Sequence, residues 1–249
     1  MSSLTSIAQT LTDSLQLSQP PIAVCFADAV PSGVKMFSGN VAAGCRFWQE
    51  AGTGVFATQV QQHELCSIGI YTHNLEMTPG AETDFGDALK VFGDLGYVRP
   101  EDIPLIPVLK QKARVIVYGP LAEVPLAPDV VLLFVKADQT LILSEASQQM
   151  ENGLPPAMGR PACAVVPQAF NTGRTALSLG CCGARAYLDV LTPEVALYAI
   201  PGAKIGEFAE RVAALAKANG VLTQFHALRR AAVEAGQHPS VKESLAAMG

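Results

Sequence analysis

The amino-acid sequence predicts an α/β or α+β protein, a single compact domain in which helices flank a mixed sheet. Short apolar runs of strand length alternate loosely with helical patterns, and glycine-rich segments connect them. Apolar residues make up 49% of the 249 residues and charged residues 16%, which is typical of a packed globule. We find no repeat at a fixed period and no long linker, so we treat residues 1–249 as one unit.

Five apolar segments have the length and composition of strands. The segment 130–137 begins with VVLLFV, a continuous apolar run that is typical of a strand buried on both faces. The predicted strands cover residues 21–27, 55–60, 114–121, 130–137 and 195–201.

Helical spacing of apolar residues is found in most of the remaining chain. We expect Gly96 to cap one helix and Gly220 to end another, since glycine favours the left-handed conformation found there. Residues 221–249 are expected to form a partly exposed helical tail, whereas residues 63–74 fit neither period clearly. Helices are predicted over residues 3–17, 44–52, 83–96, 137–153 and 203–220, with a short helix or buried segment over 161–170.

Charge and hydropathy exclude several classes of function. The formal charge of −5 gives no general attraction to nucleic acid or to an anionic membrane surface. The N-terminus lacks the basic and apolar regions of a signal peptide, and residues 130–135 are too few to span a bilayer. We therefore expect a cytoplasmic protein whose six cysteines stay reduced and do not form disulfides.

Four cysteines are candidates for a metal or cofactor site. Cys45, Cys66, Cys163 and Cys181 are spread along the chain, each beside glycine or small residues that let a bulky ligand approach. Four thiolates suit an iron–sulfur cluster or zinc, but no CxxC spacing occurs, so only the fold could bring them together. The alternative is that these cysteines pack as small apolar residues, as we expect for Cys25 in its apolar strand.

The segment LSLGCCGAR contains two adjacent cysteines, Cys181 and Cys182. Neighbouring cysteines are poorly placed for a disulfide with each other, so the two thiols are expected to differ in role. One would bind the cofactor, and the other would pack inward or support it. Arg185 could bind an anionic group, or it could form a surface ion pair.

Histidine and aromatic residues lie close to two of these cysteines. His63 and His73 flank Cys66, and the spacing of His63 and Cys66 would put both on one helix face. They could ligate zinc or haem iron, or they could make ordinary hydrogen bonds. Arg46 and Trp48, with Phe47 between them, follow Cys45 and could either line a cofactor pocket or dock a short helix on the core.

Four segments in order resemble one protein family. They are PIAVCFA, CRFWQEA, ATQVQQHELCSIGIYTH, and GRPACAVVPQAFNTGRTALSLGCCGAR followed by LYAIPGAKIGEFAE. Over residues 10–220 the chain resembles the uncharacterised domain-of-unknown-function family 169 of bacteria and archaea. The resemblance implies cysteines at Cys66, Cys163 and Cys181, with a fourth near Cys45. Family members often have a cysteine where this chain has Trp48, which puts Cys45 in doubt as the fourth ligand.

The first hypothesis for function is a cytoplasmic protein that holds an iron–sulfur cluster with a redox or Lewis-acid role. Cys66, Cys163 and Cys181 would be ligands, and Cys45 or Cys182 the fourth. The sequence contains no phosphate loop, no dinucleotide-binding fingerprint and no HExxH, so no reaction is assigned. A redox partner or a small molecule would be the partner, and a homodimer is compatible with the apolar composition.

Two further hypotheses remain open. The second is haem, bound axially by a thiolate of Cys45, Cys66 or Cys181 or by His63 or His73. In that case Trp48 and Phe47 would line the pocket, and Arg185 would bind a propionate. The third is a binding or scaffold protein without a cofactor, in which the cysteines belong only to the core.

Overall fold

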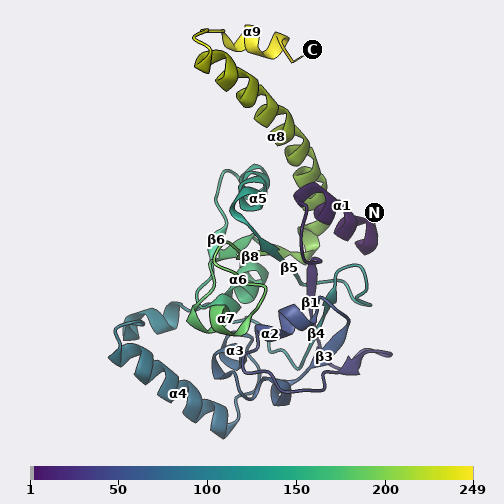
Figure 1. Cartoon of the computed structure of the whole chain (residues 1–249). Helices are drawn as coiled ribbons and strands as arrows, with labels where there is room; N and C mark the ends of the chain where they lie inside the picture. Colours follow the sequence, from purple (N-terminus) through teal and green to yellow (C-terminus); the bar gives the residue numbers. More distant parts are fainter. Residues whose placement is uncertain (1–2, 249) are drawn as a thin grey trace.

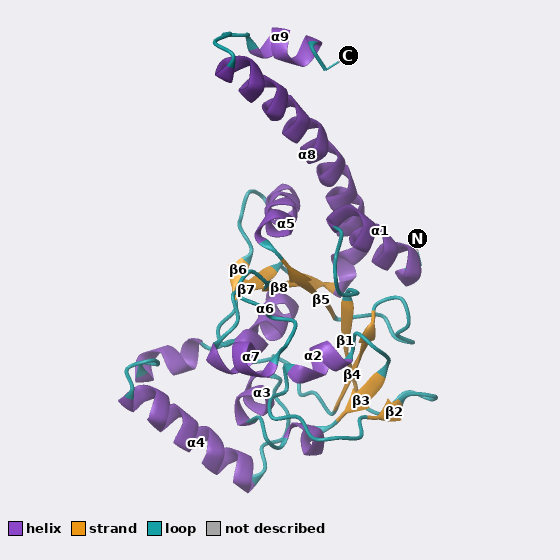
Figure 2. Ribbon diagram, viewed as in Figure 1, coloured by secondary structure: helices purple, strands orange, loops and turns teal. Residues whose placement is uncertain are grey.

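A mixed sheet of eight strands forms the middle layer of the protein, in the order β2-β3-β4-β1-β5-β8-β7-β6. The computed structural model describes residues 3–248, and Figure 2 shows the sheet in orange between two groups of helices. This confirms the predicted class. The strands are β1 (Ile22–Ala27), β2 (Lys35–Met36), β3 (Phe56–Thr58), β4 (Val115–Pro120), β5 (Val130–Val135), β6 (Ala157–Met158), β7 (Ala176–Ser178) and β8 (Ala196–Pro201).

The two faces of the sheet carry different helices and different cores. One core is formed with α1, α5 and α8 and includes Cys25, Leu133 and Phe208. The other is formed with α2, α3, α6 and α7 and includes Cys45 and Cys163. The helices are α1 (Leu4–Leu15), α2 (Arg46–Glu50), α3 (Ser67–Thr72), α4 (Pro79–Asp94), α5 (Ala137–Met150), α6 (Val165–Thr172), α7 (Cys182–Tyr187), α8 (Ile205–Glu234) and α9 (Val241–Ala246).

The sheet consists of two halves with the same topology. In the first half β1 lies at the centre of the sheet, and β2, β3 and β4 run in that order from the edge toward it. In the second half β5 lies at the centre, and β6, β7 and β8 run in the same way from the opposite edge. β2 pairs with β3 in parallel and β6 with β7 in parallel, whereas the other neighbouring strands are antiparallel. The two first strands, β1 and β5, pair with each other and join the halves across a pseudo-twofold axis.

The pairing registers of the two halves also match. Ile22, the first residue of β1, pairs with Pro120, and Val130, the first residue of β5, pairs with Pro201. In the same way Phe56 of β3 pairs with Tyr118, two residues before the proline of β4, and its counterpart Ala176 of β7 pairs with Ala199, two residues before the proline of β8. The chain therefore contains a structural repeat that its sequence, which lacks a fixed period, does not reveal.

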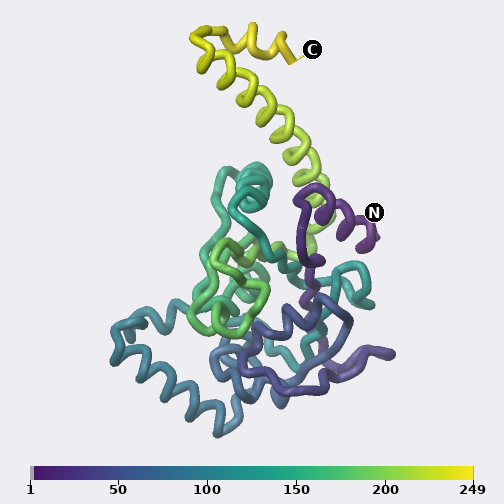
Figure 3. Tube along the Cα trace, in the orientation of Figure 1, coloured from purple at the N-terminus to yellow at the C-terminus, as the bar shows by residue number. Residues whose placement is uncertain are grey.

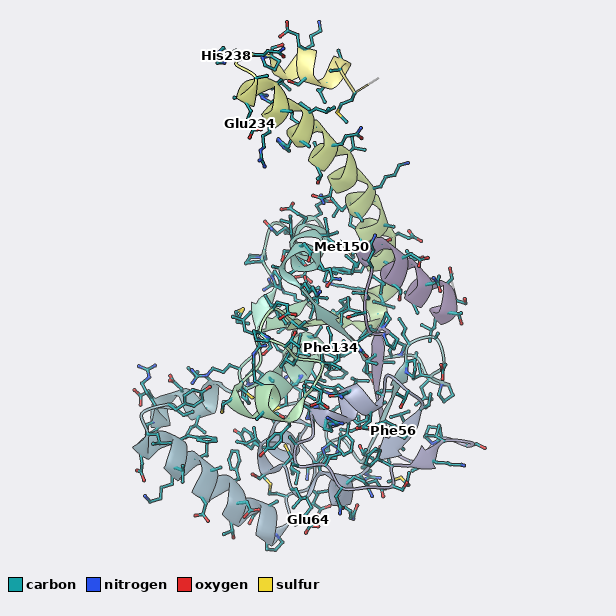
Figure 4. The ribbon with its side chains drawn as sticks, viewed as in Figure 1. Phe56, Glu64, Phe134, Met150, Glu234 and His238 are labelled. Atoms are coloured by element: carbon teal, nitrogen blue, oxygen red, sulfur yellow. The ribbon has the colours of Figure 1, made fainter. Side chains whose placement is uncertain are left out.

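The C-terminal region differs from the prediction. α8 runs through Gly220 without a break, although we expected a helix end there. Its first half packs beside α1, and its second half extends away from the sheet, as the yellow-green part of the trace shows (Figure 1, Figure 3). Glu234 and His238 lie near the tip of this extension, far from the rest of the chain (Figure 4). Within residues 3–248, no helix has the length and apolar character needed to cross a membrane.

Several local predictions are confirmed. Every residue of β5 is buried, as expected of a strand covered on both faces. Gly96 follows α4 with φ of +68°, the left-handed conformation expected of a residue that closes a helix. The unassigned segment 63–74 contains α3, a helix of only six residues.

Candidate functional site

Four cysteines occupy corresponding places in the two halves. Cys45 caps α2, which links the second and third strands of the first half, and Cys163 lies in the 3-10 turn Ala162–Ala164 before α6, which makes the same link in the second half. Cys66 follows the third strand of its half and caps α3, and Cys181 follows β7 and caps α7. Each half thus contributes two thiols to the same face of the sheet.

The four thiols lie close enough to influence one another electrostatically. Burial, together with the neighbouring Cys66 and Cys181, raises the pKa of Cys45 to about 12. Burial raises the pKa of Cys66, and the charge of Cys181 adds a smaller effect in the same direction. For Cys163, burial and then the charges of Cys66, Cys181 and Cys45 raise the pKa well above its usual value. All six pairs of these thiols therefore interact.

The same four thiols line one cavity of about 950 Å³. This cavity lies on the face covered by α2, α3, α6 and α7, and its outer wall is formed by α4. Cys45 and Cys163 are buried, Cys66 and Cys181 are half-buried, and Cys182 is exposed at the rim. Of the two roles expected for a spare thiol, inward packing is therefore wrong for Cys182.

The chain fits closely around the Cys66 thiol. Burial raises the pKa of this thiol, and the backbone of Gly44 and of Gly69 acts in the opposite direction by favouring the thiolate. A Cβ atom on Gly69 would lie 2.9 Å from Cys66 Sγ, and one on Gly44 would lie 3.7 Å from it. At Cys181, the backbone N–H of Ala184 donates to Sγ over 3.4 Å. Hydrogen bonds from backbone N–H groups to sulfur are a feature of thiolates that bind iron–sulfur clusters.

Buried polar atoms without partners lie beside the thiols. The Tyr118 hydroxyl is fully buried and has no hydrogen-bond partner among the described residues. Burial raises the pKa of this phenol, and the charges of Cys66, Cys163 and Cys45 act in the same direction, whereas the Thr58 hydroxyl acts against them. The Nδ1 atom of His63 is also without a partner and lies 3.1 Å from the position that a Cβ of Gly44 would take. Such orphaned donors are rare in folded proteins and are compatible with a group that binds at the thiols.

His63 and His73 are buried beside the site and do not line its cavity. His63 ends the 3-10 turn Val60–His63, whereas Cys66 caps the next helix, so the two do not share a helix face as we expected. The His63 Nε2 atom lies 3.0 Å from the Thr58 hydroxyl, and His73 Nδ1 lies 3.0 Å from the Gly69 carbonyl. Burial lowers the pKa of His63 to about 3 and that of His73 to about 4, so both rings are neutral at physiological pH.

Three other predicted site residues lie outside the cavity. Arg46 forms ion pairs with Glu50 at 2.9 Å and Asp189 at 3.0 Å, so its guanidinium holds α2 to the loop after α7. Trp48 is buried in the core. Arg185 donates to four backbone carbonyls, those of Leu179, Leu191, Thr192 and Val195, and so closes the loop around α7; it forms no ion pair with the residues that the structure describes.

The outer wall of the cavity contains residues that sequence analysis missed. Arg160, Arg99 and Asp102 are its charged lining residues, and Gln168 contributes an amide. Ala88, Leu89 and Phe92 of α4 form an apolar side. A cavity of this size with a mainly apolar lining and few polar groups is typical of a small-molecule site. No spacing in the sequence connects these residues to the cysteines.

The arrangement does not suit one metal ion. Within residues 3–248, no group of three histidine, cysteine or acidic side chains is placed to bind a single ion.

The family model DUF169, described as Uncharacterised ArCR, matches residues 10–211. The chain belongs to the DUF169 family. This confirms the resemblance seen in the sequence. The DUF169 match contains Cys45, Cys66, Cys163 and Cys181 and ends within the first third of α8. No curated protein and no solved structure matches the chain.

Proposed function

We propose that this protein holds an iron–sulfur cluster through Cys45, Cys66, Cys163 and Cys181. The observation that carries the proposal is that all four of these cysteines line one cavity, although they are far apart in the sequence. Core cysteines have no reason to gather in this way. Cys25, which packs against the other face of the sheet, is an example of a cysteine that belongs only to the core.

The pseudo-twofold arrangement supports a cluster with four thiolate ligands. Each half offers one cysteine before the helix between its second and third strands and one after its third strand. A cubane cluster presents several iron atoms in different directions, and ligands from two symmetric halves suit that shape. Cys45 completes the set, and Cys182 is left as an exposed neighbour.

When bound, such a cluster would supply one-electron redox chemistry. The chain's own residues would set its environment: the backbone of Gly44 and Gly69 favours the thiolate of Cys66, and the buried Tyr118 hydroxyl offers a donor. The cavity would admit a small molecule or a redox partner next to the cluster. We place this chemistry in the cytoplasm, where thiols stay reduced and available for metal.

Haem is less well supported than a cluster. His63 and His73 are buried, hydrogen-bonded on one ring nitrogen and absent from the cavity lining. Arg185, which we considered for a propionate, is used by backbone carbonyls. Without the histidines, a cysteine thiolate would have to be the axial ligand of the haem iron. A single axial thiolate does not explain why four cysteines line one cavity.

The test is to express and purify the protein without oxygen and to measure absorbance, iron and acid-labile sulfide. The proposal predicts a broad shoulder near ~400 nm with iron and sulfide in similar amounts. A sharp Soret band with iron and no sulfide would replace the cluster by haem. A colourless, folded protein without iron, even after reconstitution with ferrous iron and sulfide, would leave the cysteines as core residues.

A further inference from the structure

The cavity extends beyond the cysteines to a wall that no thiol forms. Arg160 lies on this wall, on the segment between β6 and the turn that carries Cys163. Five large apolar side chains that are exposed also line it, a concentration that marks a ligand-binding surface. They are Leu65, Tyr97, Leu105, Met158 and Tyr187.

Arg160 is held in place but forms no ion pair with the residues that the structure describes. Its Nη2 atom donates to the Tyr97 carbonyl over 2.7 Å, and its guanidinium lies 5.2 Å from the centre of the Tyr97 ring. These two contacts fix the side chain and leave further N–H donors free. A fixed guanidinium with free donors is suited to a carboxylate.

The backbone before Cys163 fixes the position of Arg160 relative to the thiols. Gly159 is pressed against the start of α6, where a Cβ on it would lie 2.8 Å from Val165 Cα and 2.9 Å from Val165 N. Arg160 and Cys163 are therefore both anchored to the N-terminal end of α6. Packing therefore sets the backbone position of Arg160 relative to Cys163, and the exposed Arg160 side chain extends from that fixed point.

The charge at this wall is positive in an otherwise acidic protein. The charged residues that line the cavity are Arg99, Arg160 and Asp102, whereas the whole chain has a net charge of −5. Both oxygens of Asp102 accept from Arg99, at 2.9 and 2.6 Å; these bonds and, to a smaller extent, the charges of Arg99 and Arg160 hold the pKa of this carboxyl below its usual value. Arg160 is the cation left for a ligand, and the half-buried amide of Gln168 lines the same cavity.

We propose that this cavity binds a small organic carboxylate with an apolar body. Arg160 would bind the carboxylate, and Leu89, Phe92 and Met158 would contact the apolar part, which would extend toward the cysteines. The inference rests on the proposed function in one respect, which is that the bound carboxylate would lie next to the iron–sulfur cluster. The binding step uses side chains that are present whether or not metal is bound.

The test is a calorimetric titration with 2-naphthoate, with its neutral amide 2-naphthamide, and with inorganic phosphate. Naphthoate should bind about tenfold or more tightly than naphthamide, because a charge-assisted pair is lost in the amide. Phosphate, which lacks the apolar body, should bind more weakly than naphthoate. Equal binding of naphthoate and naphthamide, or no saturable naphthoate binding, would overturn the inference.

Two arginine variants assign the binding to one side chain. Arg160→Gln should weaken naphthoate binding about tenfold or more and abolish the preference over naphthamide. Arg114→Gln is the matched control, since Arg114 is exposed and does not line the cavity, and it should change binding by about twofold or less. Arg160→Lys, which keeps the charge and loses the planar guanidinium, should give an intermediate affinity. Unchanged affinity in Arg160→Gln would contradict the inference.

Iron and sulfide are measured on the same samples, with and without reconstitution. Naphthoate binding by a protein that cannot form a cluster would support this inference and defeat the proposed function. A cluster-loaded protein that does not bind naphthoate would defeat this inference alone. If Arg160→Gln lowers the cluster content but leaves naphthoate affinity unchanged, Arg160 serves the cluster and the inference is wrong.

Discussion

Cys66 and Cys181 occupy equivalent positions in the two halves of the sheet. Each follows the third strand of its half and is the N-terminal capping residue of a six-residue helix, α3 or α7. The two thiols influence each other electrostatically and line the same cavity. Their equivalence makes the site a product of the fold's internal symmetry and not of a local sequence motif.

This equivalence predicts paired effects of substitution. Cys66→Ser and Cys181→Ser should each cause a large loss of iron and sulfide after anaerobic reconstitution, because each removes one thiolate ligand. Cys163→Ser and Cys45→Ser should do the same. Cys182→Ser is the matched control, one residue from Cys181 and exposed, and it should keep the wild-type iron and sulfide content. A loss in Cys182→Ser equal to that in Cys181→Ser would show that the ligand set is wrong.

The close fit at Gly69 predicts that a single methyl group damages the site. In Gly69→Ala the new Cβ would lie 2.9 Å from Cys66 Sγ, so the thiol must move. We expect the variant to lose cluster content and to be destabilised by about 1–3 kcal/mol in urea. Gly86→Ala is the control, since Gly86 lies in α4 with open space around it and gains helix propensity on substitution. Wild-type cluster content in Gly69→Ala would contradict the close fit.

The neutral, buried histidines predict a loss of stability in acid. The folded state keeps the pKa of His63 near about 3 and that of His73 near about 4, against 6.5 for a free histidine. Both rings therefore contribute stability above pH 6.5, and that contribution is lost as the pH falls toward 3, because the unfolded chain binds protons first. Iron-free protein should lose up to about 1.4 kcal/mol per pH unit for each ring, between pH 6.5 and about 3 for His63 and between pH 6.5 and about 4 for His73.

The measurement is urea unfolding of the iron-free protein at several pH values, with His63→Gln and the exposed His238→Gln compared. His63→Gln removes one titrating ring, so its stability should depend less steeply on pH between 6.5 and 3. His238→Gln should leave the wild-type slope. If both variants keep the wild-type slope, His63 does not carry the low pKa.

The continuous α8 predicts that Gly220 costs stability. No atom lies within 4 Å of a Cβ built on Gly220, and the residue is helical. Gly220→Ala should therefore raise the free energy of unfolding by about 0.5–1 kcal/mol, since glycine is a poor helix former. Thermal or urea unfolding measures it. Destabilisation would mean that the helix ends at Gly220, as the sequence alone suggests.

The strands could be predicted because they are short, apolar and buried. β4 and β5 are buried along their whole length, so their sequences contain continuous apolar runs. α3 could not be assigned, because six residues are too few to show a helical period. α8 was predicted too short, since glycine is common at helix ends but is tolerated inside a long helix.

The four cavity cysteines could be selected from the sequence, but their gathering could not. Their grouping depends on strand order, and the two halves share topology without sharing sequence spacing. Arg160 was missed because its contact at the cavity is with Tyr97, which is far from it in the sequence. Arg46 and Arg185 were candidates for a cofactor site, but their guanidinium groups bind other parts of the protein: Arg46 pairs with Asp189, and Arg185 donates to the Val195 carbonyl.

The most direct test of the central claim is a Mössbauer spectrum of protein reconstituted without oxygen with iron-57 and sulfide. A cluster bound by Cys45, Cys66, Cys163 and Cys181 predicts that all bound iron has the parameters of tetrahedral sulfur coordination, with signals of exchange-coupled irons. Cys182→Ser should give the same spectrum. Isolated high-spin ferrous ions with oxygen or nitrogen ligands, or no bound iron in a correctly folded protein, would contradict the account.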